Sequence, residues 1–243
     1  MDNGVMGSEA AGQSPKPPVQ QRSLASHQQM VDVALRLLET RDIDQISVRD
    51  IVCEAGTSNG SFYHRFGTKE HFFNYLIDDM LERRERGAIA QLSDRTIPFD
   101  ALPELLARSA MANFRAHAGL LRSAIRRHIA GDDCWNRISM MSRRIVKGFL
   151  DRVSDTLGRP LDADEAEHIN FAFVSLYGLL AYRTLRLNTL HGYTVSEQSF
   201  EDETISNFRQ LIDQALPRPT SAMRASASAK QSAGTSRLPR RAD

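Results

Sequence analysis

Residues 46–70 read ISVRDIVCEAGTSNGSFYHRFGTKE, and they carry more structural information than any other part of the chain. Apolar residues three and four positions apart predict a short helix at the start of this stretch, with Ser47 as its cap. Gly56 supplies the backbone freedom for a sharp turn. Ser58 is suited to cap a second short helix, and Thr68 a third. The stretch therefore predicts two short helices around a tight turn, followed at once by a long helix.

This order of elements is the layout of a helix-turn-helix, which places its second helix in the major groove of DNA. With Ser58 as the cap, Asn59, Gly60 and Ser61 form the first turn of that helix. Asn59 can form two hydrogen bonds with an adenine edge, and Ser61 can donate or accept at several bases. Gly60 permits close approach of the backbone. The alternative is that these polar residues serve only as helix caps.

The same residues resemble the signature of the TetR family of bacterial transcriptional regulators. The matching segments are Ala55-Gly56-Thr57-Ser58, Tyr63-His64-Arg65-Phe66 and Thr68-Lys69-Glu70, and the resemblance runs from Ser23 to Glu82. It implies an all-α fold, with an N-terminal three-helix DNA-binding domain and a C-terminal helical domain that binds a ligand and dimerises.

The resemblance also implies roles for single residues. Tyr63 is expected to donate its hydroxyl to a phosphate, Lys69 to reach a phosphate from the next helix, and Arg49 to contact the backbone or groove. Phosphate contacts position the protein, whereas base contacts specify the sequence. The complete set of expected DNA-binding residues is Ser47, Arg49, Thr57, Ser58, Asn59, Gly60, Ser61, Tyr63, His64, Arg65 and Lys69.

Two positions depart from the family pattern. Arg65 stands where the family most often has histidine or another aromatic residue, and we expect it to contact a phosphate or to pair with Glu70. The turn after the first helix lacks the usual glycine. Asp42 is the residue there best suited to a left-handed conformation.

The overall charge gives no sign of a nucleic-acid partner, because the formal net charge is only +1. From Arg22 to Arg86 the acidic residues outnumber the basic ones. DNA binding therefore requires a small local surface. We expect the affinity for non-specific DNA to be modest, so that base contacts are needed for tight binding.

Composition sets the expected domain limits. Residues 1–22 and 217–243 are rich in small and polar residues and are expected to be disordered tails, and the second tail is basic. That tail adds sequence-independent DNA affinity or is simply solvated. We expect a DNA-binding domain over 23–84, with the helix-turn-helix at 47–66, and an effector-binding and dimerisation domain over 85–216.

Caps and glycines predict the remaining helix boundaries. These are a capping box at Ser26 and Gln29, a start at Asp100 with Pro103 in the first turn, breaks at Gly119 and Gly131, a stop at Gly158, a capping box at Asp162 and Glu165, and final helices over 162–188 and 196–215.

By resemblance, the last two helices form a four-helix bundle with their copies in a second subunit. The stretch 171–182 is apolar nearly all round, as a helix buried on two sides should be, and Gly178 permits close approach. A homodimer places two recognition helices roughly 34–36 Å apart, so the double-stranded DNA operator should be a palindrome.

An effector pocket is expected inside the same domain. Its candidate lining is Phe114, Met140, Met141, Phe149, Phe173 and Tyr177, each of which has simple core packing as its alternative. A small-molecule effector that prefers a conformation with wrongly spaced recognition helices lowers operator affinity. By resemblance to the family, we expect the protein to repress transcription.

Other classes of protein are less well supported. His128, Asp132, Asp133 and Cys134 suggest a metal site, but a capped loop explains them more simply, and we expect no metal, cofactor or catalytic residue. The sequence has no glycine-rich phosphate loop or nucleophile elbow. The alternative function is a DNA-binding architectural or activator protein without an effector.

The apolar run 171–182 is shorter than the roughly 20 residues that a membrane helix needs. Two cysteines are too few for a disulfide framework. We therefore expect a soluble cytoplasmic protein, associated with the nucleoid when it is bound to DNA.

Overall fold

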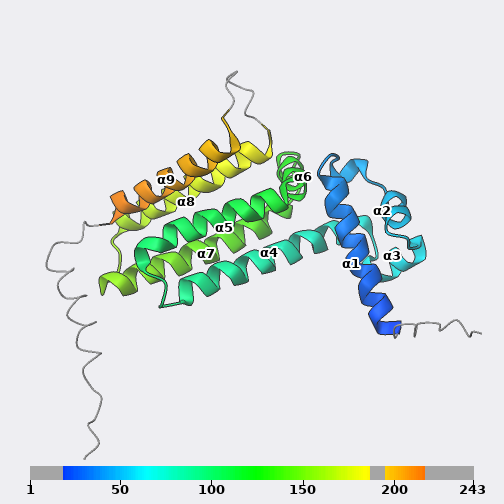
Figure 1. Cartoon of the computed structure of the whole chain (residues 1–243), viewed down its shortest axis with the longest axis horizontal. Coiled ribbons are helices and arrows are strands. Elements are labelled where there is room, and N and C mark those ends of the chain that lie inside the picture. The colour runs from blue at the N-terminus through cyan, green and yellow to red at the C-terminus, as the bar shows by residue number, and fades with distance from the viewer. Residues whose placement is uncertain (1–18, 187–194, 217–243) are drawn as a thin grey trace, which may run out of the picture. The chain divides into compact units, whose positions relative to one another are not determined.

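The computed structural model describes residues 19–186 and 195–216. Every regular element in these ranges is a helix, which confirms the predicted all-α fold (Figure 1). The chain divides between Leu76 and Ile77 into two compact units, at a point inside one long helix. The predicted division after residue 84 lies further along that helix. Of the predicted tails, residues 1–18 and 217–243, with the basic segment, lie outside the described residues, whereas residues 19–22 are helical and were wrongly placed in the first tail.

The first unit has a core of aromatic side chains that fixes its last two helices against each other. Its elements are α1 (Val19–Leu38), the 3-10 turn η1 (Ile43–Gln45), α2 (Val48–Glu54), α3 (Asn59–Phe66) and the first part of α4 (Lys69–Ser93). Phe72 of α4 lies 5.1 Å from Phe62 and 4.5 Å from Phe66, measured between ring centroids. All three rings are buried, so α3 is held by its inner face.

Two expectations for the first unit are wrong. Helix α1 begins at Val19, so Ser26 is inside the helix and not its cap. The hydroxyl of Ser26 forms a hydrogen bond with the hydroxyl of Thr57, with the two oxygens 3.3 Å apart. A serine with such a partner is tolerated within a helix. Asp42 has φ −80° and ψ 157°, which is extended and not left-handed. It forms a capping box with Gln45, which starts η1.

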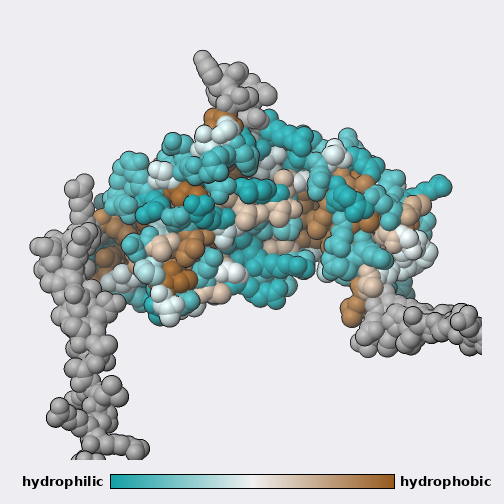
Figure 2. Space-filling model, in the orientation of Figure 1, coloured by the Kyte–Doolittle hydropathy of each residue, from teal (hydrophilic) through white to brown (hydrophobic). Residues whose placement is uncertain are grey.

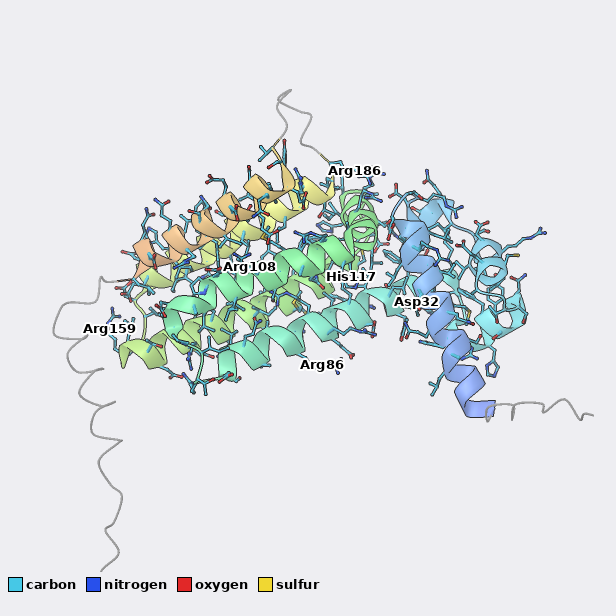
Figure 3. The ribbon with its side chains drawn as sticks, in the orientation of Figure 1. Asp32, Arg86, Arg108, His117, Arg159 and Arg186 are labelled. Carbon is cyan, nitrogen blue, oxygen red and sulfur yellow. The ribbon has the colours of Figure 1, made fainter. Side chains whose placement is uncertain are left out.

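The second unit is a bundle of long helices. Its elements are the rest of α4, the 3-10 turn η2 (Phe99–Ala101), α5 (Leu102–Ala116), α6 (Ala118–Ile129), α7 (Cys134–Leu157), α8 (Ala163–Thr184) and α9 (Glu197–Ala215). Helices α8 and α9 lie side by side and run in opposite directions (Figure 1). Arg108 of α5, labelled in Figure 3, pairs with Glu104 and with Glu201 of α9.

Helices α4 and α7 are joined by ion pairs. Arg137 pairs with Asp78 at 2.9 Å, and Arg144 pairs with Glu85 at 2.5 Å. Both pairs advance by the same number of residues along the two helices, so α4 and α7 run in the same direction. These pairs are largely exposed and add little to stability individually, but they fix the register of the two helices.

Most predicted boundaries of the second unit are correct. Asp162 and Glu165 form the expected capping box of α8, and Gly158 ends α7 with a left-handed φ of 68°. Gly119 does not interrupt a helix; it is a buried residue of the first turn of α6. The break falls at His117, with φ −122° (Figure 3). Helix α8 ends at Thr184, short of the expected end near residue 188, which lies outside the described residues.

The surface in the view of Figure 2 is mostly hydrophilic, with apolar residues in smaller areas between the polar ones. Among the helices of residues 19–186 and 195–216, none combines the length and the apolar composition needed to cross a bilayer.

Candidate DNA-binding site

The start of α2 is fixed by a reciprocal capping box. Ser47 Oγ accepts from the backbone N–H of Asp50 at 3.1 Å, and the Asp50 carboxylate accepts from the N–H of Ser47 at 2.9 Å. The hydrogen bond from the Ser47 backbone is the main reason that the pKa of Asp50 lies below its usual value. The box confirms the predicted cap and sets Arg49 on the exposed first turn of α2.

The turn between α2 and α3 depends on a glycine. Gly56 has a φ of 60°, in the left-handed region, which strains residues that carry a Cβ. No atom lies within 4 Å of the place where a Cβ would be, so the requirement for glycine is conformational and not one of space. Ser58 then caps α3, accepting from the N–H of Ser61 at 3.2 Å, as predicted.

Helix α3 has two faces of different character. Its inner face carries Phe62 and Phe66, which are buried in the aromatic core. On the outer face Tyr63 is 51% exposed, although its ring still contacts that of Phe62 edge to face. The other predicted residues that lie exposed at the start or on the outer face of the helix are Ser58, Asn59, Gly60 and His64.

Three predicted DNA-binding residues contact parts of the first unit that are distant in the sequence. Arg65 donates from Nη1 to the carbonyl oxygen of Ser23 at 2.6 Å, which ties α3 to α1. Lys69 donates from Nζ to the carbonyl oxygen of Ile46 at 2.8 Å, just before α2. Thr57 contacts Ser26 of α1, as described above. These side chains therefore hold the helices of the unit in place, a role that the sequence did not reveal.

The charges of the first unit leave few cations for a partner. From residue 23 to residue 76, Arg36 pairs with Glu54 at 2.6 Å and Arg41 with Asp50 at 3.6 Å. Arg65 and Lys69 donate to backbone carbonyls. Of the lysines and arginines in this range, only Arg49 makes neither a hydrogen bond nor an ion pair with the described residues. The outer surface around α3 thus offers mainly neutral hydrogen-bonding groups.

In the second unit, four of the six predicted effector-site residues form a continuous row of rings. Ring centroids are 6.2 Å apart for Phe114 and Tyr177, 6.4 Å for Tyr177 and Phe173, and 5.5 Å for Phe173 and Phe149. Phe99 continues the row, 5.9 Å from Phe149, and was not anticipated from the sequence. We call these five residues the aromatic row.

The two predicted methionines differ from each other. Met141 is buried, whereas Met140 is 51% exposed and lies on the outer side of α7. Successive helical residues point about 100° apart, which is why Met141 faces the core while Met140 faces outward. The Tyr177 hydroxyl is a further feature of the aromatic row, because it is buried and has no hydrogen-bond partner in the described part of the chain.

Helix α8 leaves apolar side chains exposed. Phe171 is 58% exposed and Val174 is 66% exposed. Gly178 is also exposed and lies four residues further on, so all three share one side of the helix. We call them the α8 apolar face. The opposite side of α8, with Phe173 and Leu176, is buried within the unit.

The residues that suggested a metal site contact other parts of the protein. Asp132 pairs with Arg127 at 2.8 Å and accepts from the N–H of Cys134 at 2.8 Å. Cys134 Sγ donates to the carbonyl oxygen of Ala124, and burial raises the pKa of its thiol to about 11. Within the described residues, no three His, Cys, Asp or Glu side chains are grouped to hold a metal ion.

The short capped helices and the exposed first turn of α3 define a helix-turn-helix protein. Residues 30–76 match the family model of bacterial regulatory proteins, tetR family. This segment of the first unit is therefore similar to the DNA-binding part of TetR-family regulators.

Two curated relatives resemble the first unit. The HTH-type transcriptional regulator EthR of Mycolicibacterium smegmatis is 43% identical over 54 residues, which is 22% of this chain and 25% of that protein. The uncharacterized HTH-type transcriptional regulator YwcC of Bacillus subtilis is 39% identical over 54 residues, which is 22% of this chain and 24% of that protein. The chain thus matches about a quarter of the length of these relatives.

Solved structures extend the likeness to the whole fold. GusR of Salmonella enterica has a TM-score of 0.54 at 17% identity, with 78% of this chain and 96% of that chain covered. A putative TetR-family transcriptional regulator from Mesorhizobium loti has a TM-score of 0.52 at 17% identity, with 79% and 98% covered. At this identity the likeness shows a shared fold, which includes the second unit.

Proposed function

We propose that this protein is a transcriptional regulator that reads DNA bases with the first turn of α3. The observation that carries the proposal is the exposed Asn59, placed directly after the Ser58 cap on a helix anchored by Phe62 and Phe66. Asn59 is suited to pair with an adenine edge in the major groove. The names of both curated relatives, HTH-type transcriptional regulators, agree with this function.

Phosphates are held mainly by neutral donors in this proposal. Tyr63 offers an exposed hydroxyl, and the N-termini of α2 and α3 offer backbone N–H groups. The positive ends of the dipoles of these two helices also favour an anion. Arg49 adds the one unpaired guanidinium among the lysines and arginines of residues 23–76. Because few cations take part, we expect a shallow decrease of affinity with rising salt and a large share of affinity from base contacts.

The active species is a homodimer formed through α8. Phe171 and Val174 are too exposed for apolar side chains that serve only the fold, and such patches mark association sites. Pairing α8 and α9 with their copies would bury this face. Two recognition helices then read half-sites roughly 34–36 Å apart, and the operator is a palindrome.

The second unit binds a small-molecule effector along the aromatic row. The buried Tyr177 hydroxyl supports this, because a hydroxyl without a partner gains a hydrogen bond from a ligand acceptor. An effector that binds more tightly to a state with misplaced recognition helices releases the operator, so the regulator acts as a repressor. Its place of action is the cytoplasm, at the nucleoid.

The test is selection of bound sequences from a pool of random DNA duplexes by the full chain. We expect enrichment of one palindrome by the wild type, with one adenine-containing position in each half-site that Asn59→Ala no longer selects. Steeply salt-dependent binding without any enriched sequence would contradict the proposal and favour an architectural DNA-binding protein.

A further inference from the structure

Three arginine side chains are buried in the second unit. They are Arg84, Arg122 and Arg152, at 7%, 6% and 6% exposure, and no Asp or Glu is among the buried residues of the described chain. A buried cation is costly unless an acceptor or an anion compensates it. Each buried arginine therefore needs acceptors for its donors.

Arg152, near the end of α7, has the least complete set of acceptors. Its Nη2 donates to the carbonyl oxygen of Ile97 at 3.0 Å. Its Nε and Nη1 are shielded from solvent and meet no acceptor in the described part of the chain. Arg84 differs, because its guanidinium donates to Ser109 Oγ at 3.0 Å and none of its nitrogens is among the buried atoms that lack a partner.

Asp94, whose carboxylate is affected by the charge of Arg152, does not form an ion pair with it. The pKa of Asp94 is lowered first by hydrogen bonds from Thr96, and only in a smaller degree by the charge of Arg152. The Asp94 carboxylate is exposed and accepts from the N–H and the hydroxyl of Thr96, at 2.8 Å and 2.7 Å. The guanidinium thus keeps unmet donors on its buried side.

Those donors lie beside the aromatic row. Phe149 precedes Arg152 by three residues, so both side chains lie on one side of α7. Phe99, whose ring is 5.9 Å from that of Phe149, follows the Ile97 carbonyl that holds Arg152. The guanidinium of Arg152 therefore lies next to the aromatic row, whose buried and half-buried rings continue to Tyr177.

We propose that Arg152 binds the carboxylate of an apolar organic acid whose hydrocarbon part packs along the aromatic row. This inference rests on the proposed function, because it names the chemical class of the effector of that unit. A guanidinium pairs with a carboxylate through parallel hydrogen bonds, which satisfies donors that a neutral ligand leaves unpaired. The bound carboxylate compensates the charge of Arg152, whose Nε and Nη1 have no acceptor in the described residues.

The test measures the thermal unfolding midpoint of the full chain without DNA, at constant pH and ionic strength. The probes are benzoate and decanoate, with benzyl alcohol and decanol as neutral partners of the same shape. The variants are Arg152→Met and Arg152→Lys. The matched control is Arg143→Met, which removes an exposed arginine of the same helix.

We expect at least one of the two carboxylates to raise the midpoint of the wild type and of the Arg143→Met protein, and to do so more than its alcohol. Arg152→Met should lose the shift of the midpoint. Arg152→Lys should keep part of this shift, because lysine retains the positive charge but not the planar guanidinium with its parallel donors. Without any probe, Arg152→Met should unfold at an equal or higher temperature than the wild type, since it removes a buried charge with unmet donors.

Three results would overturn the inference. One is a lower midpoint of Arg152→Met without probe, which would make Arg152 a structural anchor of the Ile97 segment. Another is a carboxylate shift that survives in Arg152→Met or is matched by the alcohol. The third is the absence of a shift with both carboxylates in the wild type. Because no DNA is present, each result is independent of whether the protein binds an operator.

Discussion

Helices α3 and α8 both expose side chains that their own unit does not need, but the chemistry of the two surfaces is opposite. The outer side of α3 carries short hydrogen-bonding groups such as Asn59, with the half-exposed ring of Tyr63. The outer side of α8 carries Phe171 and Val174, which have no hydrogen-bonding group at all. We propose a different partner for each surface: polar base edges and phosphates for α3, and an apolar copy of itself for α8.

The two surfaces also differ in how firmly the chain fixes them. Helix α3 is short and is held at its start by the Ser58 cap and along its inner face by Phe62 and Phe66. Hydrogen bonds to bases need this exact placement, because their strength falls steeply with distance and angle. The α8 apolar face needs only area and shape, which a long helix supplies without special local contacts. Each of the following changes tests one side of this difference.

The largest expected effect comes from charging the α8 apolar face. Phe171→Glu should give a monomer, because it buries a charge at the proposed interface. Loss of the second DNA-binding unit should weaken operator binding about 100-fold or more. Light scattering and operator titration measure both effects. Ile129→Glu is the matched control, since Ile129 is 76% exposed on α6 and lies off this face. A persistent dimer of Phe171→Glu would show that the interface lies elsewhere.

The next effect concerns base reading by α3. Asn59→Ala should cost about 1–3 kcal/mol in binding to the operator, since it removes a bidentate contact with one base. Binding to scrambled DNA should not change, because no phosphate contact is lost. Competition titrations with operator and scrambled DNA measure the ratio of the two affinities. An equal loss on both DNAs would assign Asn59 to the phosphate backbone instead.

Helix caps in the two units provide a matched pair of smaller effects. Ser58 caps α3 by accepting from Ser61, and Ser196 caps α9 by accepting from Ser199 in the same way. Replacement of either serine by alanine should reduce stability by about 1 kcal/mol. Only Ser58→Ala should also weaken operator binding. Denaturant unfolding and DNA titration of both variants test this, and equal DNA affinities would show that the start of α3 needs no fixed position.

The smallest effect is an acid sensitivity at the start of α8. The Arg159 side chain and the N–H of Asp162 donate to Glu165, and they lower its pKa from 4.5 to about 2. A depressed pKa means that this stabilisation is complete above pH 4.5 and is lost as the pH falls toward about 2. Glu165→Gln should therefore flatten the decrease of the unfolding midpoint in this acid range. Identical acid profiles of variant and wild type would show that the pair does not contribute.

Local features of the site could be predicted from the sequence because their contacts span few residues. The caps formed by Ser47 and Ser58 each use a partner three residues away, and Gly56 needs only its own φ angle. The same holds for the box at the start of α8. Pattern and propensity are sufficient for such features, since both partners are visible in one short segment.

Contacts between distant residues could not be predicted in this way. Arg65 and Ser23 are 42 residues apart, and Ser26 and Thr57 are 31 apart, so their pairing depends on how the helices pack. For the same reason the sequence indicated a phosphate or Glu70 as the partner of Arg65, and Ser26 was mistaken for a cap. In the second unit, Arg152 and Ile97 are 55 residues apart, and no local pattern reveals that this arginine is buried.

Whether α3 reads DNA bases is tested by fluorescence-anisotropy titration of the DNA that flanks the gene of this protein, against scrambled DNA, across a salt series. Wild type and Asn59→Ala are compared in each condition. We expect the wild type to bind one palindromic stretch tightly with a shallow salt dependence, and Asn59→Ala to lose affinity for that stretch alone. Equal binding of both DNAs by the wild type, with a steep salt dependence and no effect of Asn59→Ala, would show that α3 does not read bases.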